Sequence, residues 1–245
     1  MPSKRTKSTT ELIKEIKPTS IISKIIKHLP NDKLIRSFSQ IYLNSLPDRI
    51  LTSYTIDHLV EFIQNRYQFF ITHSNTNQSH FQIIKKTHDN LNCDLFVLES
   101  TCPDAYFLLI TIELTLQHHD ARITKMYHPI MQIVKKGNKV VDILPAKKNT
   151  TLKSTVYIEF ELEASNHSLI DTIKKDISQK INAIQCAQND HHDMVKILMT
   201  VKEKMQEHPS PIPNFHNEWI DLLDWLKNYN YSFFGYCAFE INSTT

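Results

Sequence analysis

Glycine is almost absent from this sequence: Gly137 and Gly235 are its two glycines in 245 residues. The loops that hold dinucleotides and nucleoside triphosphates, G-x-G-x-x-G and G-x-x-x-x-G-K-[ST], need closely spaced glycines so that the backbone can approach a phosphate. The G-x-S-x-G turn that carries the nucleophile of many hydrolases also needs two nearby glycines. These residues therefore encode no glycine-rich phosphate loop and no ordinary nucleotide-binding fold.

Composition and charge favour an ordinary globular protein. Hydrophobic residues make up 41% of the chain and charged residues 22%, with a formal net charge of +2. This balance gives no overall electrostatic case for binding nucleic acid, which requires clustered basic residues. The length allows one large domain or two small ones.

Cysteine spacing and hydropathy indicate a cytoplasmic location. The cysteines are far apart and form no C-x-x-C pair: Cys93, Cys102, Cys186 and Cys237. This spacing fits reduced thiols better than a disulfide framework or a zinc site. Apolar runs stay well below the roughly 20 residues of a membrane span, and charges interrupt the N-terminus where a signal peptide would be apolar. We therefore expect a soluble cytoplasmic protein with no membrane or nucleic-acid partner.

The first third of the chain has the pattern of helices. Residues 1–10 are polar and are expected to form a disordered tail, and residues 11–73 are expected to form a helical segment. Apolar spacing and capping residues predict its helices. They are a helix from Thr9-Thr10-Glu11 to Pro18, one carrying Ile21, Ile22, Ile25, Ile26 and Leu29, one capped by Asn31-Asp32 and ended by Pro47, and one starting at Thr55 or Asp57.

Strand and helix patterns alternate after the polar loop 73–80. In order they are strands at 81–86 and 94–100, a helix at 105–117, a long strand at 122–135 containing Pro129, a hairpin turn at Lys136-Gly137-Asn138, strands at 140–144 and 155–163, and a long helix from Ser168 with a break at Asn189-Asp190. From Asp94 onward this order predicts a ferredoxin-like βαββαβ sheet, hence an α+β fold. Phe233–Ile241 is the segment available for the fourth strand.

The strictest alternation in the sequence is Thr155–Glu163, TVYIEFELE. Its apolar residues alternate with Tyr157, Glu159, Glu161 and Glu163, and a half-buried strand is the only interpretation that fits. We expect the three glutamates to form a solvated face or a subunit contact rather than a catalytic carboxylate pair.

Two histidine clusters raise the question of a metal site: His118-His119 and His191-His192-Asp193. Helical zinc sites favour histidines at i and i+4, whereas adjacent residues on a helix point about 100° apart and chelate poorly. We therefore expect solvated or hydrogen-bonded histidines and no metal site.

The C-terminal segment carries the most specific resemblance. After the linker composition of Pro209-x-Pro211-x-Pro213, residues 217–240 (NEWIDLLDWLKNYNYSFFGYCAFE) predict a helix, a turn and a strand beginning at Tyr231. We expect its aromatic residues to form core rather than a ligand cage: Trp219, Trp225, Tyr231, Phe233 and Phe234. The segment resembles part of the N-terminal region of the large bacterial NAD-dependent glutamate dehydrogenases, upstream of their catalytic domain. Three further segments are similar to that region in the same order: 41–70, 103–133 and 155–163.

The resemblance covers roughly residues 34–241 and implies an ACT-like regulatory domain over residues 81–208, followed by a linker, helix and terminal strand over residues 209–245. The family oxidatively deaminates L-glutamate with NAD, giving 2-oxoglutarate and ammonia. The resemblance implies that the catalytic lysine and aspartate and the dinucleotide-binding fold lie C-terminal to this region. We therefore expect no catalytic residue, no bound cofactor and no dehydrogenase activity in this chain alone.

ACT-type modules bind amino acids or pair with a copy of themselves, so the resemblance implies a regulatory or assembly role and a homo-oligomer. The candidate effector-binding residues precede the predicted helix: Thr101, Cys102, Pro103 and Asp104. A helix N-terminus there favours a carboxylate ligand, although Asp104 competes for the same position as an N-cap. The sequence departs from the family here, because Pro103-Asp104-Ala105-Tyr106-Phe107 replaces a Pro-Phe-Leu-Val-Asp-Ser-like run and the loop has no glycine.

Two other classes of function remain open. One is a stand-alone ACT-like module that senses a small amino acid with no enzyme attached. The other is an interaction protein that uses its helical N-terminus, which requires an exposed apolar stripe at Ile21, Ile22, Ile25 and Ile26. The end of the chain, just after a predicted strand, resembles a break in a longer protein.

Overall fold

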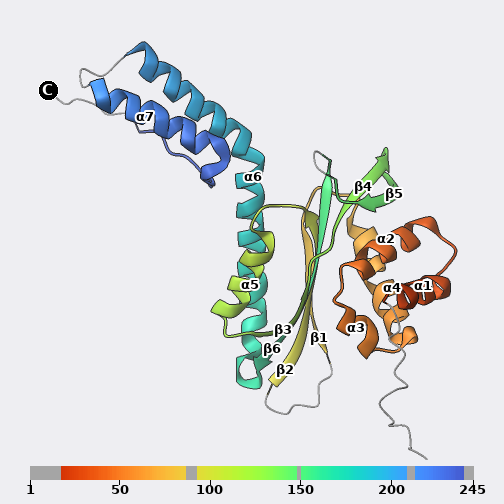
Figure 1. Cartoon of the computed structure of the whole chain (residues 1–245). Helices are drawn as coiled ribbons and strands as arrows, with labels where there is room; N and C mark the ends of the chain where they lie inside the picture. The colour runs from red at the N-terminus through yellow and green to blue at the C-terminus, as the bar shows by residue number, and fades with distance from the viewer. Residues whose placement is uncertain (1–17, 87–92, 148–149, 209–212, 240–245) are drawn as a thin grey trace, which may run out of the picture. The chain divides into compact units, whose positions relative to one another are not determined.

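The computed structural model describes residues 18–86, 93–147, 150–208 and 213–239. The chain divides into two compact units, one formed by residues 1–104 and 120–167 and the other by residues 105–119 and 168–245. Helices and an antiparallel sheet make up the structure, which confirms the predicted α+β class (Figure 1). The tail predicted at residues 1–10 and the helix predicted to start at Thr9 lie outside the described residues.

Four helices open the described part of the first unit: α1 (Pro18–His28), α2 (Lys33–Asn44), α3 (Asp48–Ser53) and α4 (Ile56–His73). The Asp32 carboxylate caps α2 by accepting hydrogen bonds from the backbone N–H groups of Leu34 and Ile35. The Thr55 hydroxyl caps α4 by accepting from the N–H of His58. Both caps confirm the sequence prediction, whereas the short helix α3 was not predicted.

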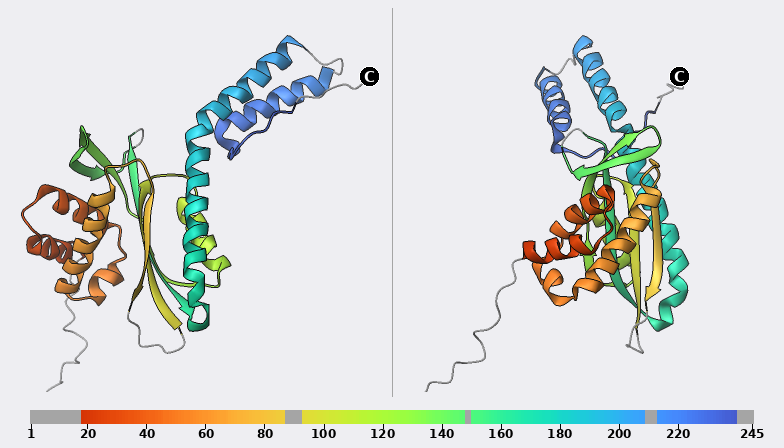
Figure 2. Two further views of the ribbon diagram at one scale, coloured as in Figure 1. Left: turned by 180° about the vertical axis from the view of Figure 1, so that it is seen from behind. Right: turned by 90° about the vertical axis from the view of Figure 1, so that its right-hand side faces the viewer.

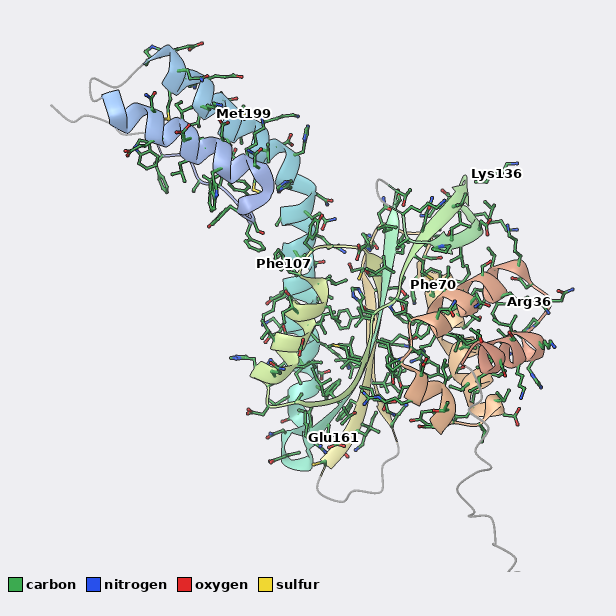
Figure 3. The ribbon with its side chains drawn as sticks, viewed as in Figure 1. Arg36, Phe70, Phe107, Lys136, Glu161 and Met199 are labelled. Carbon is green, nitrogen blue, oxygen red and sulfur yellow. The ribbon has the colours of Figure 1, made fainter. Side chains whose placement is uncertain are left out.

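These helices pack against one face of the sheet in the same unit, and their side chains form a shared core with it (Figures 2 and 3). Phe38 lies fully buried in this core. Its ring centroid is 5.5 Å from that of Tyr42, 5.5 Å from that of Tyr67 and 4.9 Å from that of Phe70. Aromatic pairs at these spacings add stabilisation beyond the area that they bury.

The apolar stripe of α1 belongs to this core. Ile21, Ile22 and Ile25 are buried and Ile26 is partly buried, in the same cluster as Val97 and Tyr157 of the sheet. An exposed stripe was the requirement for an interaction protein that uses these isoleucines. That hypothesis is therefore wrong, because these isoleucines are packed in the core. Burying their apolar surface stabilises the folded protein more than leaving it exposed to water would.

The described strands form one antiparallel sheet: β1 (His80–Lys86), β2 (Cys93–Pro103), β3 (Arg122–Tyr127), β4 (Ile130–Lys136), β5 (Lys139–Pro145) and β6 (Leu152–Glu163). The order is β1-β2-β6-β4-β5, and β3 also pairs with β6. His128 and Pro129 divide the long predicted strand into β3 and β4, because proline cannot donate a ladder hydrogen bond. The predicted hairpin turn is present at Gly137, whose φ of 60° is readily adopted by glycine.

The strand beside β2 comes from upstream in the sequence. β1 pairs antiparallel with β2, from His80 opposite Thr101 to Lys86 opposite Leu95. The sequence pattern makes Phe233–Ile241 available as the fourth strand, and this prediction is wrong for the described residues. Residues 232–239 form no strand, and 240–241 lie outside the described residues. The edge of β2 that a terminal strand would need is already hydrogen-bonded to β1.

The described part of the second unit is helical: α5 (Leu108–His118), α6 (Ile170–Glu207) and α7 (Pro213–Trp225), the last followed by a π-helical turn at Leu226–Asn230. A 3₁₀ turn at Ala164–Leu169 precedes α6, which continues through the break predicted at Asn189-Asp190. Among the described helices, α6 included, none is long and apolar enough to cross a membrane.

Polar contacts hold the helices of the second unit together. The His119 ring nitrogen lies 2.8 Å from the Asp176 carboxylate, which joins α5 to α6. The Lys202 ammonium lies 2.6 Å from the Asp224 carboxylate, which joins α6 to α7. The aromatic residues expected to form core here are largely exposed, with 64% of the Phe234 surface accessible. The prediction that they form core was wrong. An alternating apolar pattern such as that of Tyr231–Cys237 does not show whether another element packs against it.

Candidate ligand-binding cleft between helix α4 and the sheet

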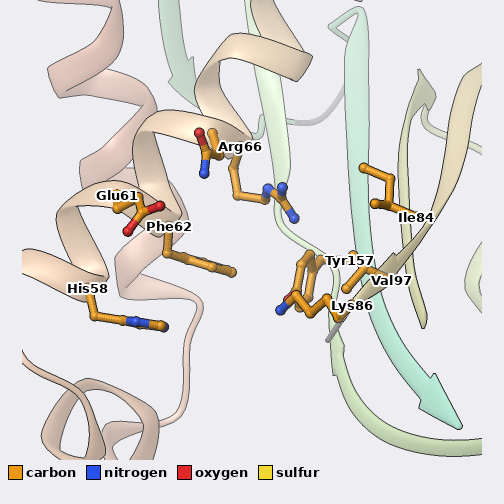
Figure 4. Close-up of a pocket in the computed structure, with 9 residues that line it drawn as sticks. His58, Glu61, Phe62, Arg66, Ile84, Lys86, Val97 and Tyr157 are labelled. Carbon is orange, nitrogen blue, oxygen red and sulfur yellow. The ribbon is translucent and has the colours of Figure 1, made fainter. Parts of the chain in front are cut away.

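A cleft in the first unit lies between α4 and the sheet (Figure 4). It consists of two adjoining pockets of about 220 Å³ and about 170 Å³. His58, Phe62, Lys86 and Tyr157 line both pockets. We call this region the α4 cleft and include in it the charged residues Arg66, Glu99, Lys125 and Glu159.

Two periodicities place these side chains together. His58, Phe62 and Arg66 are four residues apart, so they form one stripe along α4. On the sheet, Glu99 lies opposite Tyr157, and Val97 lies opposite Glu159. Because side chains two residues apart in a strand share a face, the two residue pairs present their side chains to the same side of the sheet.

Arg66 is the central cation of the α4 cleft. Its guanidinium carbon lies 5.6 Å from the centroid of the Phe62 ring and 4.9 Å from that of Tyr157, which are cation–π distances (Figure 4). Its Nε lies 2.8 Å from Oε1 of Glu99, with 13% and 3% of the two side chains exposed. The Nε–H does not point at an acceptor, so this ion pair is Coulombic rather than hydrogen-bonded.

Glu99 is held in this environment by two partners. Gln82 Nε2 donates a hydrogen bond to Glu99 Oε2 at 2.9 Å, and Arg66 supplies the neutralising charge. Burial raises the pKa of the Glu99 carboxyl, while Arg66 and the Gln82 hydrogen bond oppose that rise. The net shift is upward, so burial is the larger effect here.

Glu159 is the second carboxylate and has three donors. Lys86 Nζ lies 2.8 Å from its Oε1, Lys125 Nζ lies 2.6 Å from its Oε2, and the Tyr157 hydroxyl also donates to it. Burial alone would raise the pKa of Glu159, but these hydrogen bonds outweigh it and hold the pKa at about 2. The alternation predicts a solvated face or a subunit contact for Glu159, Glu161 and Glu163. Glu163 is exposed, but Glu159 and Glu161 are buried, because α1–α4 cover that face of the sheet.

The cations in the α4 cleft outnumber its buried carboxylates. Arg66, Lys86 and Lys125 carry three positive charges, whereas Glu99 and Glu159 carry two negative charges, which leaves one positive charge in excess. Lys86 also donates to the Tyr157 hydroxyl at 3.0 Å, and its side chain is 45% exposed. Glu61 lies at the rim and is exposed, so solvent screens its charge.

The effector-binding residues predicted from the sequence lie elsewhere. Thr101 and Cys102 are buried within β2 instead of forming a turn, and Pro103 ends that strand. Ser154 donates a hydrogen bond to the Asp104 carboxylate, so this side chain does not cap α5, which begins at Leu108 after a left-handed Phe107. These four residues adjoin one another but line neither pocket of the α4 cleft.

The predicted histidine clusters form no metal centre in the described part of the chain. His118 and His119 are adjacent rings with centroids 5.4 Å apart, and His119 contacts Asp176. His191 lies beside Phe233, with ring centroids 6.3 Å apart. Within the ranges that the structure describes, three or more histidine, cysteine or acidic side chains are nowhere grouped so as to hold a metal ion.

Sequence reasoning did not single out Arg66, Lys86 or Lys125. Each lies in a different element, so strand register and helix packing must be known before the three cations can be grouped. The available signal was the helical spacing of His58, Phe62 and Arg66, which places a cation beside the apolar face of α4.

Comparison with protein families identifies the domain. Residues 38–177, more than half of the chain, match the family described as "Glutamate dehydrogenase, ACT1 domain". Curated protein sequences and solved structures give no match to this chain. The matched residues include the sheet and α4, which together form the α4 cleft. The chain therefore belongs to the family of glutamate dehydrogenase ACT1 domains.

Proposed function

We propose that this chain is the N-terminal regulatory and assembly region of a large bacterial-type NAD-dependent glutamate dehydrogenase, and that it does not carry out the reaction itself. The family match over residues 38–177 carries this proposal. In it, L-glutamate and NAD bind another part of the enzyme, where L-glutamate is oxidised to 2-oxoglutarate and ammonia. The two glycines support this division, since neither belongs to a dinucleotide-binding fingerprint.

The protonation chemistry of the α4 cleft favours binding over catalysis. A general acid or base works best when its pKa lies near the working pH. The pKa of Glu159 is about 2. Burial lowers the pKa of Lys125, but hydrogen bonds to Glu159 and Tyr54 outweigh burial and raise it above its ordinary value. Both groups therefore keep their charges near neutral pH, which suits them to holding a ligand or a fixed structure.

Assembly and effector binding complete the proposal. We include a homo-oligomer, because β1 and β5 end the strand order and each has an edge at which a second copy could pair. An amino-acid effector near Thr101–Asp104 would have to contact Pro103 and Asp104, since Thr101 and Cys102 are buried. The proposal includes a cytoplasmic location, which the separated cysteines support.

The purified chain is expected to form no NADH when it is incubated with L-glutamate and NAD. The physical reason is the missing dinucleotide-binding fingerprint. Absorbance of NADH measures the reaction, with an active glutamate dehydrogenase as the positive control in the same buffer. Steady NADH formation that scales with the concentration of the purified chain would contradict the proposal.

A further inference from the structure

We propose that the α4 cleft binds a small organic monocarboxylate, whose negative charge is held by Arg66 and Lys86 and whose apolar part lies against Phe62, Ile84 and Val97. Such a site would lie on the face of the sheet covered by α4, separate from Thr101–Asp104. It goes beyond the proposed regulatory role, and the binding itself does not depend on that role.

Arg66 and Lys86 have hydrogen-bond donors that the described part of the protein does not use. Nε of the Arg66 guanidinium lies against Glu99, and among the described residues no hydrogen bond involves its two terminal nitrogens. Lys86 has three N–H groups, of which two are used by Tyr157 and Glu159. Arginine and lysine together can therefore offer a carboxylate a planar pair of donors and a third donor.

The net charge of the buried groups in the α4 cleft indicates the charge of its ligand. One positive charge remains after the two buried carboxylates are paired, so a ligand with one negative charge neutralises the α4 cleft. A phosphate with two negative charges would leave one of them uncompensated in a partly buried site. The balance of the buried charges therefore favours a monoanion over a dianion.

One wall of the α4 cleft is apolar. Phe62, Ile84 and Val97 line the larger pocket, and Ile84 keeps 46% of its surface exposed. Burying this surface against an apolar ligand is favourable by roughly 25 cal/mol per Å². The larger pocket, at about 220 Å³, lies below the usual range for drug-sized ligands, so the ligand is small.

The test is a titration of the full chain with isovalerate, a branched monocarboxylate, followed by NMR of labelled isoleucine methyl groups. We expect a saturable shift of the Ile84 methyl signal. Isovaleramide has nearly the same shape but no charge, and it is expected to give no saturable shift. No saturable shift of Ile84 with isovalerate, or equal binding of the amide, overturns the proposal.

Lys86→Gln is expected to weaken isovalerate binding by about tenfold or more, because it removes a charged hydrogen bond. Lys85→Gln is the matched control. Lys85 is adjacent in β1, points to the other side of the sheet and pairs with Asp94 at 2.7 Å, so its loss should leave the affinity unchanged. Equal affinities of the two variants would overturn the proposal.

The methyl spectrum shows directly whether Lys86→Gln is folded. If Lys86→Gln is not folded, isovalerate binding is measured with Arg66→Lys instead. This substitution keeps the positive charge and removes the planar pair of donors. Weaker isovalerate binding by Arg66→Lys supports the site, and unchanged binding overturns it. Failure to bind isovalerate leaves the NADH assay unaffected, so the inference and the proposed function can fail separately.

Discussion

Replacing Glu159 with glutamine is expected to lower the free energy of unfolding by roughly 3 kcal/mol at neutral pH. The carboxylate is buried and accepts hydrogen bonds from Lys86, Lys125 and Tyr157. Glutamine keeps one oxygen acceptor but removes the negative charge, so two lysines are left without their counter-ion. Urea denaturation of the variant and the unsubstituted protein measures the difference.

The pH dependence of this difference has a definite sign. Glu159 has a pKa of about 2 in the folded protein, against an ordinary value of 4.5. Because the folded value is the lower one, the contribution of Glu159 to stability is complete above about pH 4.5 and is lost as the pH falls through 2. The stability difference between the two proteins should shrink over that window. Comparing the proteins at each pH cancels the titration of Glu99, which occurs in both.

Glu163→Gln is the matched control for Glu159→Gln. Glu163 lies at the exposed end of the same strand and loses the same charge. Its substitution is expected to change stability by no more than about 0.5 kcal/mol. Equal costs for the two variants, or a difference that stays constant down to about pH 2, would show that the Glu159 network does not stabilise the fold.

Phe38→Ala is expected to cost about 3–5 kcal/mol of stability, the usual range for deleting a buried aromatic ring. Phe38 is fully buried among the rings of Tyr42, Tyr67 and Phe70, so the substitution leaves a cavity that these rigid neighbours cannot fill. A loss of this size approaches half the total stability of many domains. Urea denaturation provides the measurement.

Tyr106→Ala provides a surface comparison for Phe38→Ala, since 82% of Tyr106 is exposed. Its cost should remain below about 1 kcal/mol. If Phe38→Ala cost no more than this, the α1–α4 helices would not share a tight core with the sheet. The α4 cleft would then lose the rigid wall that positions Arg66.

Local signals in the sequence predicted much of the fold. Asp32 and Thr55 mark helix starts because their side chains satisfy backbone N–H groups within the next three residues. The alternation at Thr155–Glu163 predicts a strand, and Gly137 marks a turn that requires a positive φ. Each of these features depends on residues close together in the chain.

Features that depend on distant residues were not predictable in the same way. Alternation at Tyr231–Cys237 resembles that of a strand, but it cannot reveal that β1 already occupies the edge of β2. The same limit applies to the candidate site. Glu159 looks like part of a solvated face until the helices are placed over it, and Arg66, Lys86 and Lys125 meet only through packing and strand register.

Hydrogen–deuterium exchange of the full chain, with and without saturating isovalerate, tests the central claim that a ligand is bound in the α4 cleft. We expect slower exchange in α4 and in β1 and β6, where Arg66, Lys86 and Tyr157 would contact or surround the ligand. Slower exchange confined to residues 101–108, around the effector loop predicted from the sequence, would contradict it. Unchanged exchange throughout the chain would contradict it equally.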